Sequence, residues 1–414
     1  MCRLISLCIL LSLTIIIAEP SYPAEKDALI DFSSSCEYTF AQGLLQKGIS
    51  HASYESIISE ELKSPDARKL AIETFYKTYG FNKAVEESLY FFSRRIKEGF
   101  TTLLSRSGRY ISMMSEILKE KNLPPELVFL PLIESGFNPY ALSPKKASGL
   151  WQFIPSTAKR YGLKIDWWVD ERRDPVKATL AATKYLSELY SIFGSWNLAL
   201  AAYNAGEGKI MRALGKAKTD NFWVLRNTKY IKKETKNYVP SYIAATAIAK
   251  DPEGFGFQDI NYHEPMAYDE VTINSPMDIE IIARYAGVDV KEIRELNPEL
   301  KRWCTPPNVS SYNLRIPANT KERFLANLSN AGDVKHFSVG HYTVNKGDTL
   351  KKIATRRGIS VEAICELNSL NKDSRLQAGS TILVPPKGIA PLVKDTERVK
   401  GKFSGKKKSP KSKV

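Results

Sequence analysis

Hydrophobic side chains recur at helical spacing from residue 25 to about residue 250, with few turn signals between them. Within this region, Asp174 and Pro175 are typical of a helix start, and Gly194 is typical of a helix end. The apolar positions between them follow one face, at Leu180, Ala181, Tyr185, Leu186, Leu189 and Phe193. Further helices are expected over about 196–203 and 234–250. The pattern predicts an N-terminal helical segment (25–90) followed by an all-α domain (91–255).

The pattern changes after residues 254–256, where the chain contains two internal copies of one motif. Residues 278–297 match residues 349–368, so that Gly287 aligns with Gly358 and Asn297 with Asn368. Short β-like runs flank each copy, at 271–273 and 314–316 around the first and at 342–344 and 381–384 around the second. Each repeat is long enough to bury a small core of its own. The sequence therefore predicts two α+β modules of βααβ order, at 264–320 and 341–386.

The first 24 residues have the features of a signal peptide. Arg3 provides a positive start, and Leu4 to Ala18 form a nearly continuous apolar run, which is short for a membrane-spanning helix. Cleavage after Ala18 or Ala24 predicts an exported mature protein, and an uncleaved membrane anchor is the alternative. Of the remaining cysteines, Cys36, Cys304 and Cys365, at least one is expected to be free or intermolecular, because their number is odd. No CxxC motif or His/Cys cluster is present, so we expect no metal and no cofactor.

A formal net charge of +15 favours acidic partners, such as an anionic membrane surface or wall polymer. No nucleic-acid-binding motif accompanies this charge, so we expect no nucleic-acid partner. The Lys-rich tail (387–414) cannot bury apolar area and is expected to be disordered. The tail is either a plain solvated end or a weak, salt-sensitive contact to wall polymers or anionic lipid. The sequence identifies no protein partner.

Glu134 is the strongest candidate for acid–base chemistry. It lies in the last turn of a helix expected to start at Pro124-Pro125, on the same face as Leu127, Leu130 and Pro131. Apolar surroundings and the negative end of the helix dipole both disfavour the anion, so we expect a raised pKa. A carboxyl group that keeps its proton near neutral pH can act as a general acid. The alternative is a Glu that caps backbone amides at a helix–loop corner.

Other motifs follow Glu134 in order, and each also has a plain structural interpretation. Gln152 offers an amide for a ligand, while its neighbours Trp151 and Phe153 are expected to pack in the core. Tyr203 and Asn204 lie at a helix exit, where Asn204 could instead be a simple C-cap. Glu234 and Tyr238 share a helix face, where a hydrogen bond between them could merely brace the helix.

Taken together, these motifs resemble those of the soluble lytic transglycosylases of the goose-type lysozyme superfamily. The similarity covers roughly residues 85–385 and is greatest to the membrane-bound lytic murein transglycosylase D branch, which joins this domain to LysM repeats. It implies a multidomain protein with an all-α lysozyme-like catalytic domain and LysM-type modules. Glu134 would be the sole catalytic acid and base. The positions that face the glycan or orient the Glu would be Ser143, Gln152, Tyr203, Asn204, Glu234 and Tyr238.

The resemblance implies cleavage of peptidoglycan between N-acetylmuramic acid (MurNAc) and N-acetylglucosamine (GlcNAc), with 1,6-anhydro-MurNAc ends and without added water. A muramidase-type hydrolase would need a second carboxylate roughly 5 to 10 Å from the first. The candidates are Asp166, Asp170, Glu171 and Asp174, for which we favour loop capping and pairing with Arg172 and Arg173. A non-catalytic wall-binding scaffold is the third hypothesis, and the intact motifs argue against it.

The second repeat resembles a LysM module, in which glycan would lie between two loops. These loops map to Gly347, Asp348 and Thr349 on one side and to residues 370–379 on the other. Helix capping is the plain interpretation of Asp348 and Thr349. The first repeat departs from the pattern at residues 275–277 and 303–307, so it is expected to keep the fold and to serve as a spacer packed on the catalytic domain. Peptidoglycan is the expected partner, and the periplasm or cell envelope the expected location.

Overall fold

The computed structural model describes residues 82–331 and 336–386. The predicted signal peptide (1–24), most of the predicted 25–90 segment, Cys36 and the basic tail (387–414) lie outside the described residues. Among the residues that the structure describes, no helix combines the length and the hydropathy needed to cross a membrane.

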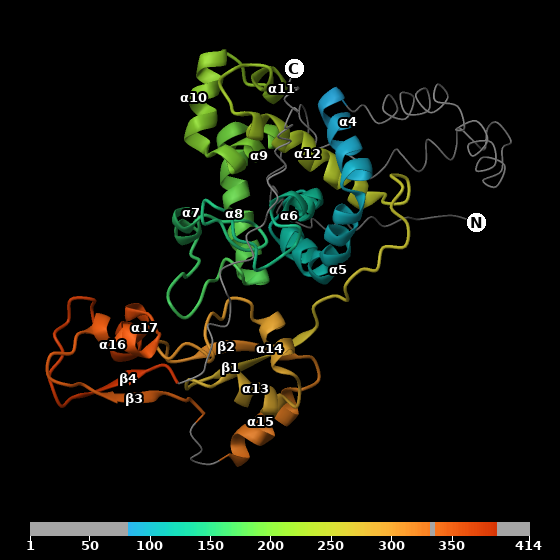
Figure 1. Cartoon of the computed structure of the whole chain (residues 1–414). Helices are drawn as coiled ribbons and strands as arrows, with labels where there is room; N and C mark the ends of the chain where they lie inside the picture. Colours follow the sequence, from blue (N-terminus) through green and yellow to red (C-terminus); the bar gives the residue numbers. More distant parts are fainter. Residues whose placement is uncertain (1–81, 332–335, 387–414) are drawn as a thin grey trace, which may run out of the picture. The chain divides into compact units, whose positions relative to one another are not determined.

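The predicted all-α domain is confirmed (Figure 1). It begins with α4 (Lys83–Tyr90), a π-helical turn η1 (Phe91–Arg95) and the long α5 (Lys97–Glu120). The helices that follow are η2 (Pro125–Phe129, 3-10), α6 (Leu130–Glu134), α7 (Pro155–Arg160), α8 (Pro175–Phe193), α9 (Trp196–Ala205), α10 (Glu207–Ala217), α11 (Phe222–Arg226) and α12 (Lys233–Lys250).

Local signals fix the ends of α8 as expected. The Asp174 side chain accepts hydrogen bonds from the backbone N–H groups of Val176 and Lys177, both at 2.9 Å. At the other end Gly194 has a φ of 64°, a left-handed conformation that glycine adopts without steric cost.

The core of the helical domain forms around α12, which contacts α4, α6 and α9, and around α8, which contacts α5 and α9. Because α4 contacts α12 and its Val85 and Leu89 are buried, the helical packing continues across residue 90. Burial of this apolar surface is the main stabilising contribution. Large, fully buried members of the core include Leu104, Met114, Trp151 and Tyr242.

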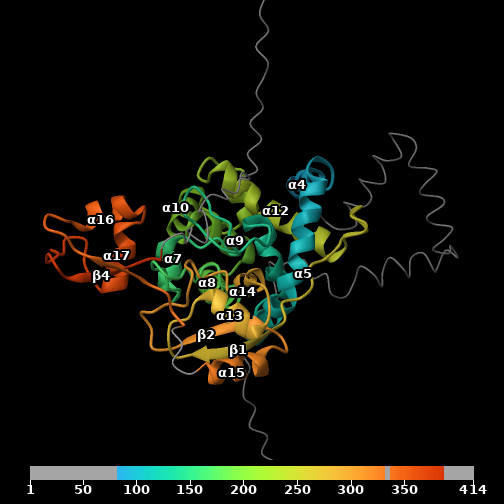
Figure 2. The same ribbon diagram turned by 60° about the horizontal axis from the view of Figure 1, so that its bottom comes forward.

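Both α+β modules have the predicted βααβ order. The first contains β1 (Tyr268–Ile273), α13 (Ile279–Ala286), α14 (Val290–Leu296) and β2 (Tyr312–Pro317). The second contains β3 (Gly340–Thr343), α16 (Leu350–Arg357), α17 (Val361–Asn368) and β4 (Thr381–Val384). In each module the two strands pair antiparallel. Figure 2 shows the first module with its helices around the two-stranded sheet.

The two copies share a hydrogen-bond pattern as well as a fold. Asn297 donates to the carbonyl of Arg315 and accepts from its N–H, which ties the end of α14 to β2. Asn368 does the same with Leu383 of β4. A buried amide that satisfies both backbone groups of one strand residue stabilises the corner between helix and strand. The aligned Asn residues are therefore structural in both modules.

The first module extends past residue 320, where the sequence-based range ended. Helix α15 (Lys321–Asn330) contacts α13, and its Phe324 is fully buried in the core of the module. That core also contains Trp168 and Val169, which come from the helical domain. The expected packing of this module on the helical domain is therefore seen directly. The second module has a separate core, built on Tyr342, Ile353, Ile364 and Ile382.

Candidate active site

Glu134 is the last residue of α6. A single helix was expected from Pro124-Pro125, but the segment is a 3-10 turn followed by a short α-helix, because Pro131 has no N–H to donate back to Leu127. Leu127, Leu130 and Pro131 are buried as predicted, while Glu134 is partly exposed. The carboxylate therefore emerges from an apolar support.

Tyr238 of α12 donates a hydrogen bond from its hydroxyl to Oε1 of Glu134. Tyr238 is buried, and burial together with the nearby charge of Glu134 raises its pKa well above the ordinary value. The phenol is therefore a neutral donor at physiological pH. Its hydroxyl reaches across to α6, so bracing of Glu234 does not account for its position.

The loop of residues 141–153, called the active-site loop below, is folded by its own polar side chains. Gln152 has a φ of 50°, and its Nε2 donates to the carbonyls of Ala141 (3.1 Å) and Gly149 (2.9 Å). Ser143 Oγ accepts from the N–H of Ala147 at 3.0 Å. Both predicted site residues thus hold the loop in shape, whatever else they contact.

The active-site loop is also fixed to the helices beneath it. Trp151 and Phe153 are buried as expected, and Tyr203 of α9 donates to the carbonyl of Trp151 at 2.7 Å. Ser135, which follows Glu134, donates to the carbonyl of Leu150 at 2.8 Å. Burial, and then the charge of Glu134, raise the pKa of Tyr203 well above its ordinary value. The loop and Tyr203 are therefore held close to the carboxylate.

Asn204 and Glu234 connect α9 to the start of α12. Asn204 Oδ1 accepts from Thr235 Oγ1 at 3.0 Å, and its Nδ2 donates to Glu234 Oε1 at 3.4 Å. Glu234 is exposed and lies 4.0 Å from Lys145 of the active-site loop. Asn204 is not the C-cap of α9, which is Gly206; its amide instead joins two helices at the edge of the site.

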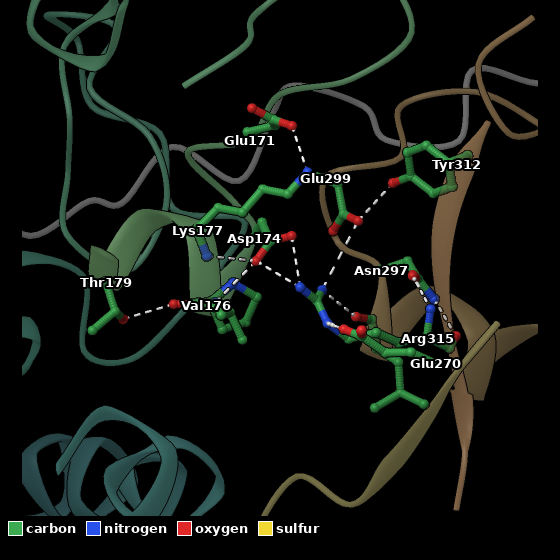
Figure 3. A network of polar contacts seen from close by, with 12 residues as sticks. Glu171, Asp174, Val176, Lys177, Thr179, Glu270, Asn297, Glu299, Tyr312 and Arg315 are labelled. Carbon is green, nitrogen blue, oxygen red and sulfur yellow. Dashed lines mark hydrogen bonds and ion pairs between the residues drawn. The ribbon is translucent and has the colours of Figure 1, made fainter. Parts of the chain in front are cut away.

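The four further carboxylates considered from the sequence all have structural partners. Asp166 accepts from two backbone N–H groups of its own turn, at 2.7 Å each. Asp170 pairs with Arg172 at 2.7 Å, and Glu171 with Lys177 at 2.6 Å. Asp174 caps α8 as expected. Its second partner, Arg315 of the first module, lies 141 positions away and has no signal in the local sequence (Figure 3).

In the second module, Gly347 has a φ of 83°, and nothing lies within 4 Å of the place a Cβ would take. The side chain of Asp348 is only 4% exposed and accepts from the Tyr342 hydroxyl (2.7 Å) and the Asn345 N–H (2.9 Å). The hydrogen bond from Tyr342 lowers the pKa of Asp348. Thr349 caps α16 by accepting from the Lys352 N–H at 3.3 Å. Asp348 and Thr349 thus shape the loop, and Gly347 leaves its backbone accessible.

No group of three or more His, Cys, Asp and Glu side chains within 82–331 and 336–386 is arranged to hold a metal ion. Cys304 and Cys365 are both free and buried. The side chains described around Glu134 offer a carboxylate, two neutral phenols, amides and hydroxyls.

Comparison with known proteins assigns families to the three folded parts. The transglycosylase SLT domain family matches residues 112–225. The family described as the LysM-like domain of lytic transglycosylase MltD matches residues 267–332, and the LysM domain family matches residues 342–385.

Similar proteins cover up to about two thirds of this chain. Membrane-bound lytic murein transglycosylase D of Escherichia coli (strain K12) is 33% identical over 293 residues, which are 67% of this chain and 64% of that protein. The chain thus spans less than two thirds of that relative. The soluble lytic murein transglycosylase of the same organism is 32% identical over 121 residues, 28% of this chain and 18% of the relative. The crystal structure of the 70 kDa soluble lytic transglycosylase from E. coli is 27% identical and covers 35% of this chain and 24% of its own, with a TM-score of 0.30. The chain thus carries a transglycosylase SLT domain, followed by a LysM-like domain of the lytic transglycosylase MltD type and by a LysM domain.

Proposed function

We propose that this protein is an exported peptidoglycan lytic transglycosylase. It would cleave the β-1,4 bond between MurNAc and GlcNAc and leave 1,6-anhydro-MurNAc ends. The observation that supports the proposal most is the contact between Tyr238 and Glu134, the latter inside residues 112–225 that match the transglycosylase SLT domain. A carboxyl group on an apolar support, held by a neutral donor, is suited to transfer a proton in both directions.

In this mechanism Glu134 first gives its proton to the glycosidic oxygen, and the bond to the anomeric carbon of MurNAc breaks. The acetamide of the substrate stabilises the resulting cation. Glu134 then removes the proton from the C6 hydroxyl, whose oxygen bonds to the anomeric carbon. The carboxyl group ends as it began, and no water is consumed. Because the pKa of Tyr238 is raised, this residue can donate to the carboxylate between the two steps.

The environment of the other carboxylates supports a single-Glu mechanism over hydrolysis. A two-carboxylate glycosidase needs its second acid free to act as nucleophile or base. The carboxylates of Asp170 and Asp174 are nearly fully buried and paired with Arg172 and Arg315. Asp166 and Glu171 accept backbone hydrogen bonds in their own loop. These contacts favour structural roles for the four residues.

The remaining predicted site residues would bind glycan around Glu134. Gln152 uses Nε2 for the active-site loop, so its Oε1 is the atom that we assign to a sugar hydroxyl or acetamide N–H. Ser143 and Tyr203 would shape the floor of the site, and Asn204 with Glu234 would form its edge. The exposure of Glu234 suits a contact to substrate, and its charge is balanced by Lys145.

The LysM module would tether the enzyme to glycan strands and raise the local substrate concentration. Gly347 allows the backbone to approach a sugar closely, while Asp348 and Thr349 fix the loop. The E. coli relative is named as membrane-bound, and we infer an envelope location for this protein as well. The basic tail would add a weak, salt-sensitive attraction to anionic wall polymer or lipid.

Mass spectrometry of a peptidoglycan digest tests the proposal. Anhydro ends are lighter by one water than the reducing ends of a muramidase, and a non-catalytic scaffold gives no fragments. Glu134→Gln keeps the side-chain shape but lacks the transferable proton, so turnover should fall to background while binding to insoluble peptidoglycan persists. Glu126→Gln is the matched control, because it makes the same chemical change in a residue that pairs with Lys250. Reducing ends alone, or substantial turnover by Glu134→Gln, would reject the mechanism.

A further inference from the structure

Residues 164–174, called the bridging loop below, connect α7 to α8 and contact both the active-site loop and the first module. On the module side, the backbone of Val169 pairs antiparallel with Leu300. The N–H of Lys301 donates to the carbonyl of Trp168 and the N–H of Asp170 donates to the carbonyl of Glu299, both at 2.9 Å. Trp168 is itself part of the core of the module. The module and the bridging loop therefore share both a core and a backbone ladder.

A buried ion pair secures the end of the bridging loop. Nη2 of Arg315 donates to both carboxylate oxygens of Asp174, at 3.0 and 2.9 Å. The side chains of Arg315 and Asp174 are 7% and 1% exposed. Figure 3 shows this pair between the start of α8 and β2, with Glu299 and Tyr312 beside it. Because the same carboxylate caps α8, the first turn of that helix is coupled to the module.

On its other side, the bridging loop holds the active-site loop. Nη1 of Arg172 donates to the carbonyls of Lys146 (2.5 Å) and Phe153 (3.0 Å), while Asp170 holds the rest of the guanidinium. Gly149 packs directly on the backbone of residue 172, where a Cβ would lie 1.7 Å from the carbonyl oxygen. The shape of the active-site loop therefore depends on the position of the bridging loop.

The two copies of the repeat differ at the residues that make these contacts. The shared Asn pattern aligns Arg315 with Leu383, and the helix alignment places Leu370 where the first copy has Glu299. The two loops that flank the sheet of the first copy are also joined by hydrogen bonds. The N–H of Thr305 donates to the carbonyl of Met277, and the N–H of Met277 donates to Oγ1 of Thr305. The first copy thus has a charged contact to the helical domain, through Arg315, at a position where the second copy has an apolar residue.

We propose that the first module is a supporting part of the active site, in which Arg315 is a positioning residue that acts through Asp174 and the bridging loop on the active-site loop. The inference rests on the proposed function for its kinetic readout only. On this proposal the first module supports turnover, whereas the second module tethers the enzyme to glycan.

Hydrogen exchange and kinetics of Arg315→Met and Asp174→Asn test the proposal in the full chain. Asp174→Asn keeps a side-chain oxygen for the α8 cap and loses the charge, so it provides a second, milder perturbation. Exchange in residues 141–153 should become about tenfold faster, and kcat on soluble glycan fragments should fall by about tenfold, since small displacements of reacting groups are costly. Exchange in α5 should be unchanged, which separates loss of positioning from general loss of stability.

Arg356→Met is the matched control. It removes another Arg–Asp pair, with Asp348 at 3.2 Å, but in the second module. This variant should leave both exchange in residues 141–153 and kcat on soluble fragments unchanged. If Arg315→Met does not fold, Asp174→Asn decides the result. Folded variants with wild-type exchange in 141–153 and wild-type kcat would overturn the proposal. The exchange result stands even if the wild type forms no anhydro ends, so the two proposals can fail separately.

Discussion

Gly149 provides a sharp test of how the active-site loop is held. A methyl group at this position would lie 1.7 Å from the carbonyl oxygen of Arg172, whereas real Cβ atoms essentially never approach within 3.0 Å. The two backbones must therefore separate by at least 1.3 Å, the difference between those distances. Backbone atoms cannot rotate away as a flexible side chain can. The Gly149→Ala substitution should thus displace the loop that carries Gln152.

Two costs are expected from Gly149→Ala, and they can be separated. The left-handed φ of 84° costs a non-glycine residue about 1–2 kcal/mol of stability. The displacement should also lower kcat/KM by about 100-fold, the usual effect of a misplacement near 1 Å. Gly162→Ala is the matched control, because Gly162 has a φ of 87° with nothing within 4 Å of its Cβ position.

The assay combines thermal unfolding with product formation from soluble glycan fragments. Both variants should lose stability through φ, and Gly149→Ala should lose more because of the displacement, but only Gly149→Ala should lose activity. Wild-type kcat/KM in both variants would show that the loop tolerates the displacement, contrary to this expectation. Equal losses of activity in the two variants would contradict it as well, because Gly162 makes no close contact.

Three further predictions follow from the contacts described. Burial and the adjacent Asp174 raise the pKa of Glu299 from 4.5 to about 7, so the folded state favours the protonated form and stability should fall as pH rises through this range. Glu299→Gln should remove that fall, as seen in Tm at pH 5 and pH 8. An equal change of Tm with pH in the wild type and the variant would contradict the cause. Tyr238→Phe removes a hydrogen bond to a charged group worth about 1.5–3 kcal/mol, so kcat should fall by about 10- to 100-fold, with no further loss when it is combined with Glu134→Gln. Asp348→Ala should weaken binding to insoluble peptidoglycan by about tenfold through loss of loop hydrogen bonds, while turnover of soluble fragments stays constant. A change in the turnover of soluble fragments would argue against separate roles for catalysis and tethering.

The sequence alone was enough for features that depend on near neighbours. The helix from Pro175 to Phe193 begins at its predicted cap and ends at its predicted glycine, because capping and left-handed turns involve residues within one turn of each other. Both βααβ modules follow from periodicity and repetition. Burial of Trp151 and Phe153 also follows, because large apolar rings favour the core.

The break at Pro131 shows where local signals were present but incompletely used. A single helix was expected to lead to Glu134, yet the missing N–H of Pro131 divides it into η2 and α6. Gln152 was expected to meet a ligand, which stays a prediction for its Oε1; what the sequence did not indicate is that its amide nitrogen bonds to the active-site loop. Whether a polar side chain faces ligand or backbone depends on loop conformation, which spacing in sequence does not specify.

Which distant groups meet depends on how the elements pack in three dimensions. Tyr238 reaches Glu134 across 104 positions, and Arg315 reaches Asp174 across 141. The sequence contains all four residues and predicts a helix for three of them, but their pairing depends on how α6, α8, α12 and β2 pack. Short-range chemistry therefore determined the elements and the candidate acid. Long-range packing determined which side chain contacts that acid and joined the first module to the bridging loop, because a side-chain contact depends on distance in space and not along the chain.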